Sequence, residues 1–405
     1  MNANPRRSLT WIAYTLMLAQ GFAVYGVSYL TPYMSSELGV PTWAASAPNG
    51  AMAIGFLVAA FLVPVIGRRI GAEAAVRTWA LLMAVAAVLT ASASFPFVVL
   101  GGLLIGIGSA GTIVHTVASI GSQRNGLYMV RASVWSMTGG LLSPLVLWVA
   151  TRSLGWNTGI LVVVPFAIAV AGLVRPRGST SSPDAAPVAE VTHGAGRVLR
   201  AQRLGGAYWA AWWFLVLMVG TEFAFVAWGA QVAVVRTGLP LAEATALASL
   251  LTAGELVGRL AWGLGLAARV DRVHTLRGIA VLTLAGAIVL GLAPNAPAAA
   301  AGLLLGGLGL SLAFPVTSSV ALSHAHAAPV QASAWLNLSW GVAILVAPMV
   351  LGLVASGMGV APAWLLVPIL LIAAVAVALR VPRPAAEAQA VPLPDRTLPL
   401  DAEPA

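Results

Sequence analysis

The chain has 405 residues, of which 60% are hydrophobic and only 8% are charged, and its mean hydropathy is +0.93. Soluble globular proteins carry about 25% charged residues, so this composition excludes a soluble domain and predicts an all-α integral membrane protein. The formal net charge of +9 comes from arginines that lie mostly in short turns between apolar runs, a pattern that indicates membrane topology and argues against a nucleic-acid partner.

The first predicted element follows the basic start MNANPRRSLTW. The apolar stretch after it is too long for a signal peptide and has no small-residue cleavage site, so we interpret it as an uncleaved membrane helix. Apolar stretches of about 20 residues, the length that crosses a hydrocarbon core of about 30 Å, recur about twelve times along the chain. The predicted spans are 10–34, 46–66, 75–93, 96–121, 128–151, 157–174, 208–235, 243–267, 277–293, 296–322, 330–355 and 359–380.

Two stretches without apolar periodicity divide this pattern. Residues 175–206 are rich in proline, glycine, serine and arginine and are typical of a linker. Residues 382–405 have the composition of a disordered tail. The predicted organisation is therefore an N-terminal six-helix bundle at 1–174, the linker, a C-terminal six-helix bundle at 207–381, and the tail.

The placement of arginine predicts the orientation of the chain, because arginine is enriched in cytoplasmic loops. Only Arg152 and Arg236 fall in the loops of one side. The other side has Arg6, Arg7, Arg68, Arg69, Arg77, Arg124, Arg175, Arg177, Arg269, Arg272, Arg277, Arg380 and Arg383. We therefore predict a multi-pass protein of the cell membrane, with both termini, the linker and the tail in the cytoplasm.

The two halves of the chain are similar to each other. GLLIG at 102–106 is followed by HTVAS, and about 200 residues later GLLLG at 302–306 is followed by PVTSS. GVP at 39–41 recurs as GLP at 238–240, and Gly55 matches Gly254. A nearly constant offset across several helices predicts two related bundles in parallel orientation, because six crossings return the chain to its starting side.

This architecture resembles the major facilitator superfamily over nearly the whole chain. The resemblance implies two six-helix bundles around a central cavity and secondary transport by alternating access. The family's loop between helices 2 and 3 typically reads Gly-x-x-x-Asp-Arg-x-Gly-Arg; here Arg68 stands in the aspartate position, followed by Arg69 and Gly71. The equivalent loop of the second half keeps Arg269 but has Ala268 in place of the aspartate.

One carboxylate, Glu222, lies near the middle of the seventh predicted span. An ionised carboxylate in hydrocarbon costs roughly 2.5–3.5 kcal/mol on insertion scales. The functional hypothesis is a proton-coupling group, since burial favours the neutral form of a carboxyl that can then load and release a proton. The alternative is a neutral acid that hydrogen-bonds a neighbouring helix.

Polar residues form stripes on two helices that are equivalent under the repeat. On the fourth predicted span Ser109, Thr112 and His115 are three residues apart, and on the tenth Ser311 and Ser318 lie on one face. These stripes predict two walls of a water-filled path. Ser109, Thr112, Ser311 and Ser318 are candidates for substrate binding, and His115 is a candidate proton relay or substrate contact. The alternative for His115 is an interhelical hydrogen bond.

Further candidates follow from helical spacing. Glu255 and Arg259 are four residues apart with the acid first, which predicts a structural ion pair and, as a second role, a gate. Candidates for substrate contact, for which packing is the alternative, are Tyr25 and Tyr29 on the first span and Asn337 and Trp340 on the eleventh.

The sequence therefore predicts a secondary active transporter of a small organic solute, with proton coupling as symport or antiport. Its expected partners are the lipid bilayer, the solute and protons, and we expect a functional monomer. The motifs of zinc peptidases, P-loop ATPases and serine hydrolases are absent and there is no cysteine, so we expect no enzymatic activity, no metal and no other cofactor. Export of drug-like or natural-product molecules and uptake of sugars or organic acids both remain open. The alternative from another class is a receptor or scaffold that has kept the fold and lost transport.

Overall fold

The computed structural model describes residues 5–121, 126–174, 204–263, 270–325 and 329–383, and all regular structure within them is helical. The tail beyond Arg383 and most of the predicted linker lie outside the described residues. The helices of the first half are α1 (Pro5–Tyr29), α2 (Thr31–Leu38), α3 (Thr42–Ala45), α4 (Ala47–Ile70), α5 (Ala72–Ala91), α6 (Phe95–Gly121), α7 (Gly126–Ser153), the 3-10 helix η1 (Gly159–Val162) and α8 (Val163–Leu173). Those of the second half are α11 (Gly206–Thr237), α12 (Leu241–Gly263), α13 (Arg272–Gly291), α14 (Ala296–Leu310), α15 (Ala313–Ser323), α16 (Pro329–Met358), α17 (Val360–Ala363) and α18 (Leu366–Arg380).

The lengths of these helices agree with a chain that crosses a membrane about twelve times. Within the described residues, ten helical stretches are long and apolar enough to span a membrane. The 25-residue α1 and the shorter apolar helix at Gly159–Leu173 bring the crossings to the predicted twelve. Large apolar side chains lie on the outer surface, such as Phe61, which is 72% exposed. Such a surface suits contact with lipid.

Glycines at matching positions bring helices into backbone contact in both halves. In the first half Gly55 of α4 meets Gly106 of α6, where an added Cβ on either residue would come closer than 3.0 Å to backbone oxygen of the other helix. In the second half Gly254 of α12 and Gly307 of α14 make the same crossing. Small residues permit this close approach in membrane helices. The repeat is therefore confirmed in three dimensions, with Gly307 rather than Gly306 as the contact equivalent to Gly106.

The tenth predicted span is broken into α14 and α15. A helix carbonyl normally accepts from the backbone N–H four residues later, and four residues after Ser311 stands Pro315, which has no N–H. The helix turns at residues 311–312, and the carbonyl of Ser311 has no helical donor. The first span also ends earlier than predicted: α1 stops at Tyr29, and α2 begins with a proline in its first turn.

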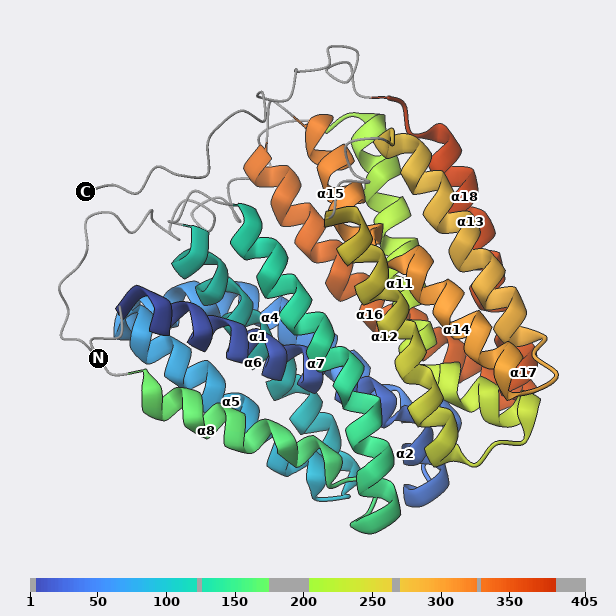
Figure 1. The fold of residues 1–405 in the computed structure, drawn as a ribbon, viewed down its shortest axis with the longest axis horizontal. Helices are drawn as coiled ribbons and strands as arrows, with labels where there is room; N and C mark the ends of the chain where they lie inside the picture. The colour runs from blue at the N-terminus through green and yellow to red at the C-terminus, as the bar shows by residue number, and fades with distance from the viewer. Residues whose placement is uncertain (1–4, 122–125, 175–203, 264–269, 326–328, 384–405) are drawn as a thin grey trace, which may run out of the picture.

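The two bundles contact each other mainly at one end (Figure 1). We call the side where α1 begins and α18 ends the linker side, and the opposite side the far side. The main contacts between the bundles pair α7 with α12 and α4 with α16. In Figure 1 the helices of the two bundles converge toward the far side, near α2, and diverge toward the linker side. The arrangement places the middle of α1, α11 and α12 where the bundles meet.

Candidate functional site

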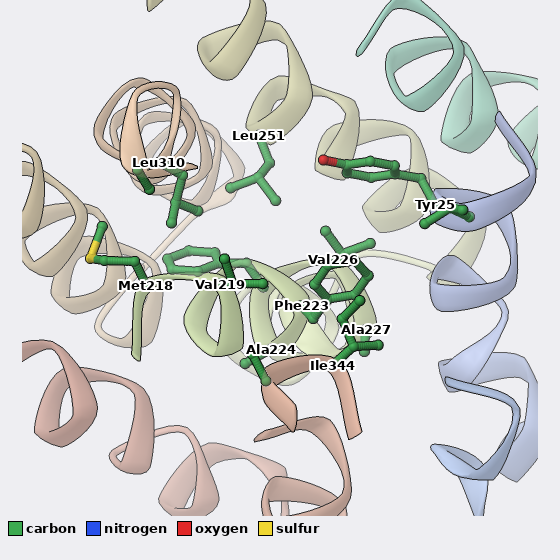
Figure 2. Packing of buried hydrophobic residues seen from close by; sticks show 14 of the residues in the cluster. Tyr25, Met218, Val219, Phe223, Ala224, Val226, Ala227, Leu251, Leu310 and Ile344 are labelled. Carbon is green, nitrogen blue, oxygen red and sulfur yellow. The ribbon is translucent and has the colours of Figure 1, made fainter. Parts of the chain in front are cut away.

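Two acidic side chains of the second bundle meet one tyrosine of the first. The hydroxyl of Tyr25 on α1 lies 2.7 Å from Oε1 of Glu222 on α11 and 3.2 Å from Oε2 of Glu255 on α12. Figure 2 shows the ring of Tyr25 extending from α1 toward the helices of the second bundle. Glu222 is 4% exposed and Glu255 is fully buried. We call these three residues the acid cluster.

Arg259 lies one turn beyond Glu255 on α12 but contacts other groups. Its Nε donates to the carbonyl of Ser311 at 2.9 Å, which is the carbonyl that Pro315 leaves without a helical donor. Its Nη1 donates to Oγ of Ser133 on α7 at 3.2 Å. Among the ion pairs of the described residues there is none between Glu255 and Arg259. The predicted pair is therefore wrong as a direct contact, because the break in the helix offers the guanidinium a free acceptor and Glu255 turns to Tyr25.

Arg259 nevertheless supplies the positive charge of this region. It is close enough to act electrostatically on both Glu222 and Glu255. One carboxyl oxygen, Oε1 of Glu255, is buried and has no hydrogen-bond partner. An unsatisfied buried acceptor is costly in a medium of low dielectric constant, so this oxygen is available to a proton or a ligand.

A row of aromatic rings starts at the acid cluster and crosses into the second bundle. The ring of Phe223 on α11 lies 6.3 Å from Tyr25 and 6.3 Å from Trp340, and Trp340 lies 5.5 Å from Phe314 on α15. The buried Nε1 of Trp340 has no hydrogen-bond partner. We call Phe223, Trp340 and Phe314 the aromatic row. Phe223 is buried and Trp340 and Phe314 are half-buried, so the row is an apolar lining with one free donor beside two carboxyls.

Polar contacts hold the bundles together on the far side of the acid cluster. Tyr29 donates to the carbonyl of Ala248 at 3.3 Å. A substrate that accepted a hydrogen bond from Tyr29, as predicted, would have to replace this bond. The hydroxyl of Tyr33 lies 3.1 Å from that of Thr245. Arg152 forms an ion pair with Glu243, and Ser46 donates to the carbonyl of Pro348. These contacts close the far side between the bundles.

The polar stripe on α6 does not face the second bundle. Ser109 contacts the sulfur of Met83 on α5, and His115 bonds the carbonyl of Gly111 on its own helix. The ring of His115 lies 6.2 Å from that of Trp79 on α5 and beside Gly67 of α4. Thr112 is buried, and its hydroxyl has no partner. These contacts hold Ser109 and His115 inside the first bundle, and the hydrogen bond of His115 lies within α6 rather than between two helices.

The remaining predicted positions are spread more widely. Ser318 is half-buried on α15, one turn after Phe314, and its hydroxyl has no partner. Gly71 ends α4 with a φ of 81°, and Arg69 is exposed in the last turn. Arg269 and the side chains of Arg68 and Asn337 lie outside the described part of the structure.

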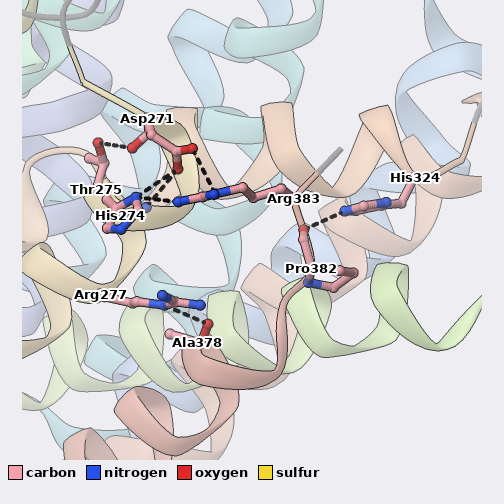
Figure 3. A network of polar contacts seen from close by, with 8 residues as sticks. All are labelled: Asp271, His274, Thr275, Arg277, His324, Ala378, Pro382 and Arg383. Atoms are coloured by element: carbon pink, nitrogen blue, oxygen red, sulfur yellow. Dashed lines mark hydrogen bonds and ion pairs between the residues drawn. The ribbon is translucent and has the colours of Figure 1, made fainter. Parts of the chain in front are cut away.

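A separate polar network on the linker side joins the start of α13 to the end of the described chain (Figure 3). Asp271 caps α13 by accepting from the backbone N–H of His274 at 2.9 Å, and its other oxygen pairs with Arg383 at 3.2 Å. The backbone N–H of His274 makes the largest contribution in lowering the pKa of the Asp271 carboxyl below its usual value, and the hydrogen bond from the His274 side chain and the charge of Arg383 also lower it. His324 contacts the carbonyl of Pro382 at 3.2 Å. The network fastens the segment after α18 to the second bundle.

The sequence did not reveal Phe223 and Phe314, or the contact of Tyr25 with both acids. The internal repeat could have indicated that Tyr25 lies near Glu222. Gly21 of α1 and Gly220 of α11 occupy equivalent places in the two halves, so the counterpart of Tyr25 falls within one turn of Glu222. Polar residues at the same depth on these two equivalent helices are expected to face each other across the centre.

Comparison with known proteins agrees with this architecture. The family model for the Major Facilitator Superfamily matches residues 11–330. No curated protein sequence matches the chain. Among solved structures, a point mutant of the nucleoside transporter NupG superposes with a TM-score of 0.73 at 11% identity, covering 92% of this chain and 99% of that one. A bacterial homologue of the human lysosomal transporter Spinster, inward-facing and unoccupied, gives 0.67 at 14% identity, covering 94% and 98%. At these identities the likeness shows a shared fold.

Proposed function

The chain belongs to the major facilitator superfamily, and from that premise we propose that it is a proton-coupled secondary transporter of a small organic solute. The observation that carries the coupling is the acid cluster. Two carboxyls are buried where the bundles meet, near the middle of the apolar helices α11 and α12. Ionisable groups inside membrane-spanning helices commonly serve ion or proton pathways. A carboxyl at this place exchanges its proton with one side at a time only if the bundles around it move.

The geometry supports a route by which the proton controls that movement. Tyr25 belongs to the first bundle and both acids belong to the second, so the hydrogen bonds of the acid cluster join the two moving bodies. A change in the proton on Glu222 alters a bond between the bundles rather than within one. Because a ligand shifts a conformational equilibrium only through different affinity for the two states, a site that spans both bundles is well placed to do so.

We place the solute beside the acid cluster, on the aromatic row. Aromatic faces stack on planar or apolar solutes, and the free Nε1 of Trp340 and the free Oε1 of Glu255 provide a donor and an acceptor. Among the described residues of this region Arg259 is the single cation. That charge content disfavours a multiply charged anion. NupG, which has a similar fold at 11% identity, is a nucleoside transporter, and a nucleoside with its planar base is one class of solute that would suit the aromatic row.

We further propose that the linker side faces the cytoplasm, as the arginine bias indicates. In that orientation the far-side contacts close the extracellular end and the structure corresponds to an inward-facing state. Because the chain has no cysteine, single cysteines placed at Arg69 and at Leu154 report topology cleanly. A membrane-impermeant maleimide should label the second from outside intact cells and spare the first. The reverse pattern would overturn this orientation.

The transport proposal is tested with purified protein in proteoliposomes. A thermal-stabilisation screen of nucleosides, sugars and organic acids selects the solute, and its uptake is then followed under an imposed pH gradient of either direction. Glu222→Gln keeps the shape of the side chain but carries no proton. It should fold and bind the solute, while uphill uptake falls to the level of empty vesicles.

The matched control is Glu37→Gln, which removes an exposed acid at the end of α2, outside the acid cluster and outside the far-side contacts named above. It should retain uphill uptake. Normal uphill uptake by Glu222→Gln would reject Glu222 as the coupling group, and solute binding without any flux in the unsubstituted protein would favour the receptor or scaffold alternative.

A further inference from the structure

The acid cluster presents a problem of proton counting. The hydroxyl of Tyr25 has one hydrogen, yet it lies within hydrogen-bond distance of two carboxyl oxygens, at 2.7 Å and 3.2 Å. An ionised carboxylate only accepts hydrogen bonds. Tyr25 therefore donates its one hydrogen fully to one carboxyl only. A second full hydrogen bond at the phenolic oxygen requires the other carboxyl to carry a proton and donate it.

Charge balance gives the same count. Two ionised carboxylates beside Arg259 would leave one negative charge without compensation in the membrane interior, and two neutral acids would leave one positive charge. A single proton on the pair makes the cluster with Arg259 neutral. Since an uncompensated charge at this depth is costly, one proton is the favoured occupancy.

From these two counts we propose that Glu222 and Glu255 share one proton through the hydroxyl of Tyr25. The inference rests on the transport function proposed above and makes Glu255 a second proton-carrying residue and Tyr25 the link between the two. In the exchange, the O–H bond of Glu255 breaks as its proton passes to the oxygen of Tyr25, while the hydrogen of Tyr25 passes to Glu222. The reverse transfer restores the first state, and no other reactant is needed.

The surroundings leave few competitors for this proton. Tyr29, one turn further along α1, donates to the carbonyl of Ala248. Tyr14 stacks on Trp135 of α7, at 6.2 Å, and His115 lies between α4, α5 and α6. On the helices packed against α1, α11 and α12, the other described titratable side chains lie near helix ends: Tyr33, Glu37, Arg69, Glu73, Arg77, Arg152, Tyr208, Arg236, Glu243, Arg272, His274, Arg277 and Arg380.

The shared proton also explains why the acids are arranged around a first-bundle residue. If one carboxyl held the proton alone, a partner on its own bundle would serve equally well. With Tyr25 as the link, separation of the bundles removes the route between Glu222 and Glu255. The proton then stays on one acid, which can release it to whichever side is open.

Infrared spectroscopy tests the sharing directly, through the carbonyl stretch of a protonated carboxyl. The protein is measured at pH 7 in a detergent without esters, so that no lipid ester overlaps the band. The unsubstituted protein should show a band equivalent to one carboxyl per chain. Glu222→Gln and Glu255→Gln should each abolish it, because the acid that remains is ionised beside Arg259 and accepts from Tyr25.

Independent protonation gives a different pattern, in which only one of the two substitutions abolishes the band. That pattern, a band worth two carboxyls, or no band in the unsubstituted protein would each overturn the proposal. Glu243→Gln, on the same helix α12 as Glu255, is the control and should leave the band unchanged. Melting curves identify any variant that has lost its fold.

A second variant keeps the test decisive if a glutamine variant is unstable. Tyr25→Phe retains the ring contacts with Phe223 and Tyr29 but removes the link. The band of the unsubstituted protein should titrate in two widely separated steps, as expected for a coupled pair, and Tyr25→Phe should bring the steps closer together. Unchanged separation would overturn the proposal.

Neither infrared measurement uses solute or a gradient, so its result separates from that of the flux assay. If either glutamine substitution abolishes the band but transport does not depend on protons, the proton is shared and its role is structural. If transport is proton-driven and the band follows Glu222 alone, the proposed function stands and the sharing falls.

Discussion

Removing one hydroxyl from the far-side closure should measurably open that side. Tyr33 lies on α2, where its ring stacks on Trp156 of the same bundle, at 6.0 Å with an angle of 5° between the planes. Its hydroxyl is 3.1 Å from that of Thr245 in the other bundle. Thr245 already donates to the carbonyl of Leu241, so Tyr33 is the donor between the bundles. In Tyr33→Phe the stacked ring stays in place and only the hydrogen bond is lost.

The size of the shift in the conformational equilibrium depends on the groups that remain after the hydroxyl of Tyr33 is removed. Thr245 keeps its bond to Leu241 and loses one interaction as an acceptor, so no buried donor is left without a partner. The loss is therefore that of an ordinary intramolecular hydrogen bond, about 0.5–1.5 kcal/mol. The bond exists only while the far side is closed. The ratio of far-side-open to far-side-closed protein should rise by about two- to twelve-fold, because about 1.4 kcal/mol corresponds to a factor of ten.

Double electron–electron resonance measures these populations directly. Spin labels on cysteines at Leu154 in the first bundle and Leu292 in the second, both exposed on the far side, report the separation of the bundles. The control is Tyr208→Phe, which removes a phenol bond to the carbonyl of Ala332 within the second bundle. It should leave the ratio unchanged. If both variants shift the ratio equally, or neither does, the far-side contacts do not set the equilibrium.

Two further outcomes concern stability. Gly307→Ala should lower the free energy of unfolding by about 1–3 kcal/mol, since its Cβ would overlap the backbone of α12, whereas Gly278→Ala on α13, with open space around it, should be neutral or slightly stabilising in the same melting assay. The stabilising contribution of Asp271, whose pKa is lowered on folding, should be fully present above its unfolded pKa of about 3.9 and disappear as the pH falls through the folded pKa. The melting temperatures of the protein and of Asp271→Asn should therefore differ by a constant amount above pH of about 5 and converge below about 4; a difference that persists in acid would contradict the role of the charge.

The architecture could be predicted from the sequence because it depends on averages over many residues. Hydropathy over 20 residues locates a crossing whatever the individual contacts are, and arginine counts combine evidence from many loops. The offset between the halves survives because glycine crossings such as Gly55 with Gly106 tolerate few substitutions. Single interruptions of a helix are harder to predict. The sequence on both sides of Pro315 is apolar, so hydropathy predicts one continuous tenth span, although the missing N–H of this proline breaks the helix.

The candidate site could be predicted only in part, because it depends on which residues meet across the bundles. The depth of Glu222 in its span marked it as unusual. The spacing of Glu255 and Arg259 indicated an ion pair, because helical periodicity identifies neighbours on the same helix and gives no information about partners on other helices. The carbonyl of Ser311 and the hydroxyl of Tyr25 are competing partners that come from distant segments, and their competition is visible only in three dimensions.

The glycine crossings have a mechanical consequence. Where Gly55 meets Gly106, and Gly254 meets Gly307, main chain rests on main chain, with no flexible side chain between them to absorb a displacement. The contacts between the bundles are made instead by side chains such as Tyr33 and Arg152, which change rotamer at low cost. Each bundle should therefore move as a rigid body, and the contacts between the bundles should rearrange to let one bundle rotate relative to the other. A small displacement at the height of Glu222 would then be amplified along the length of the helices into a wider opening at their ends.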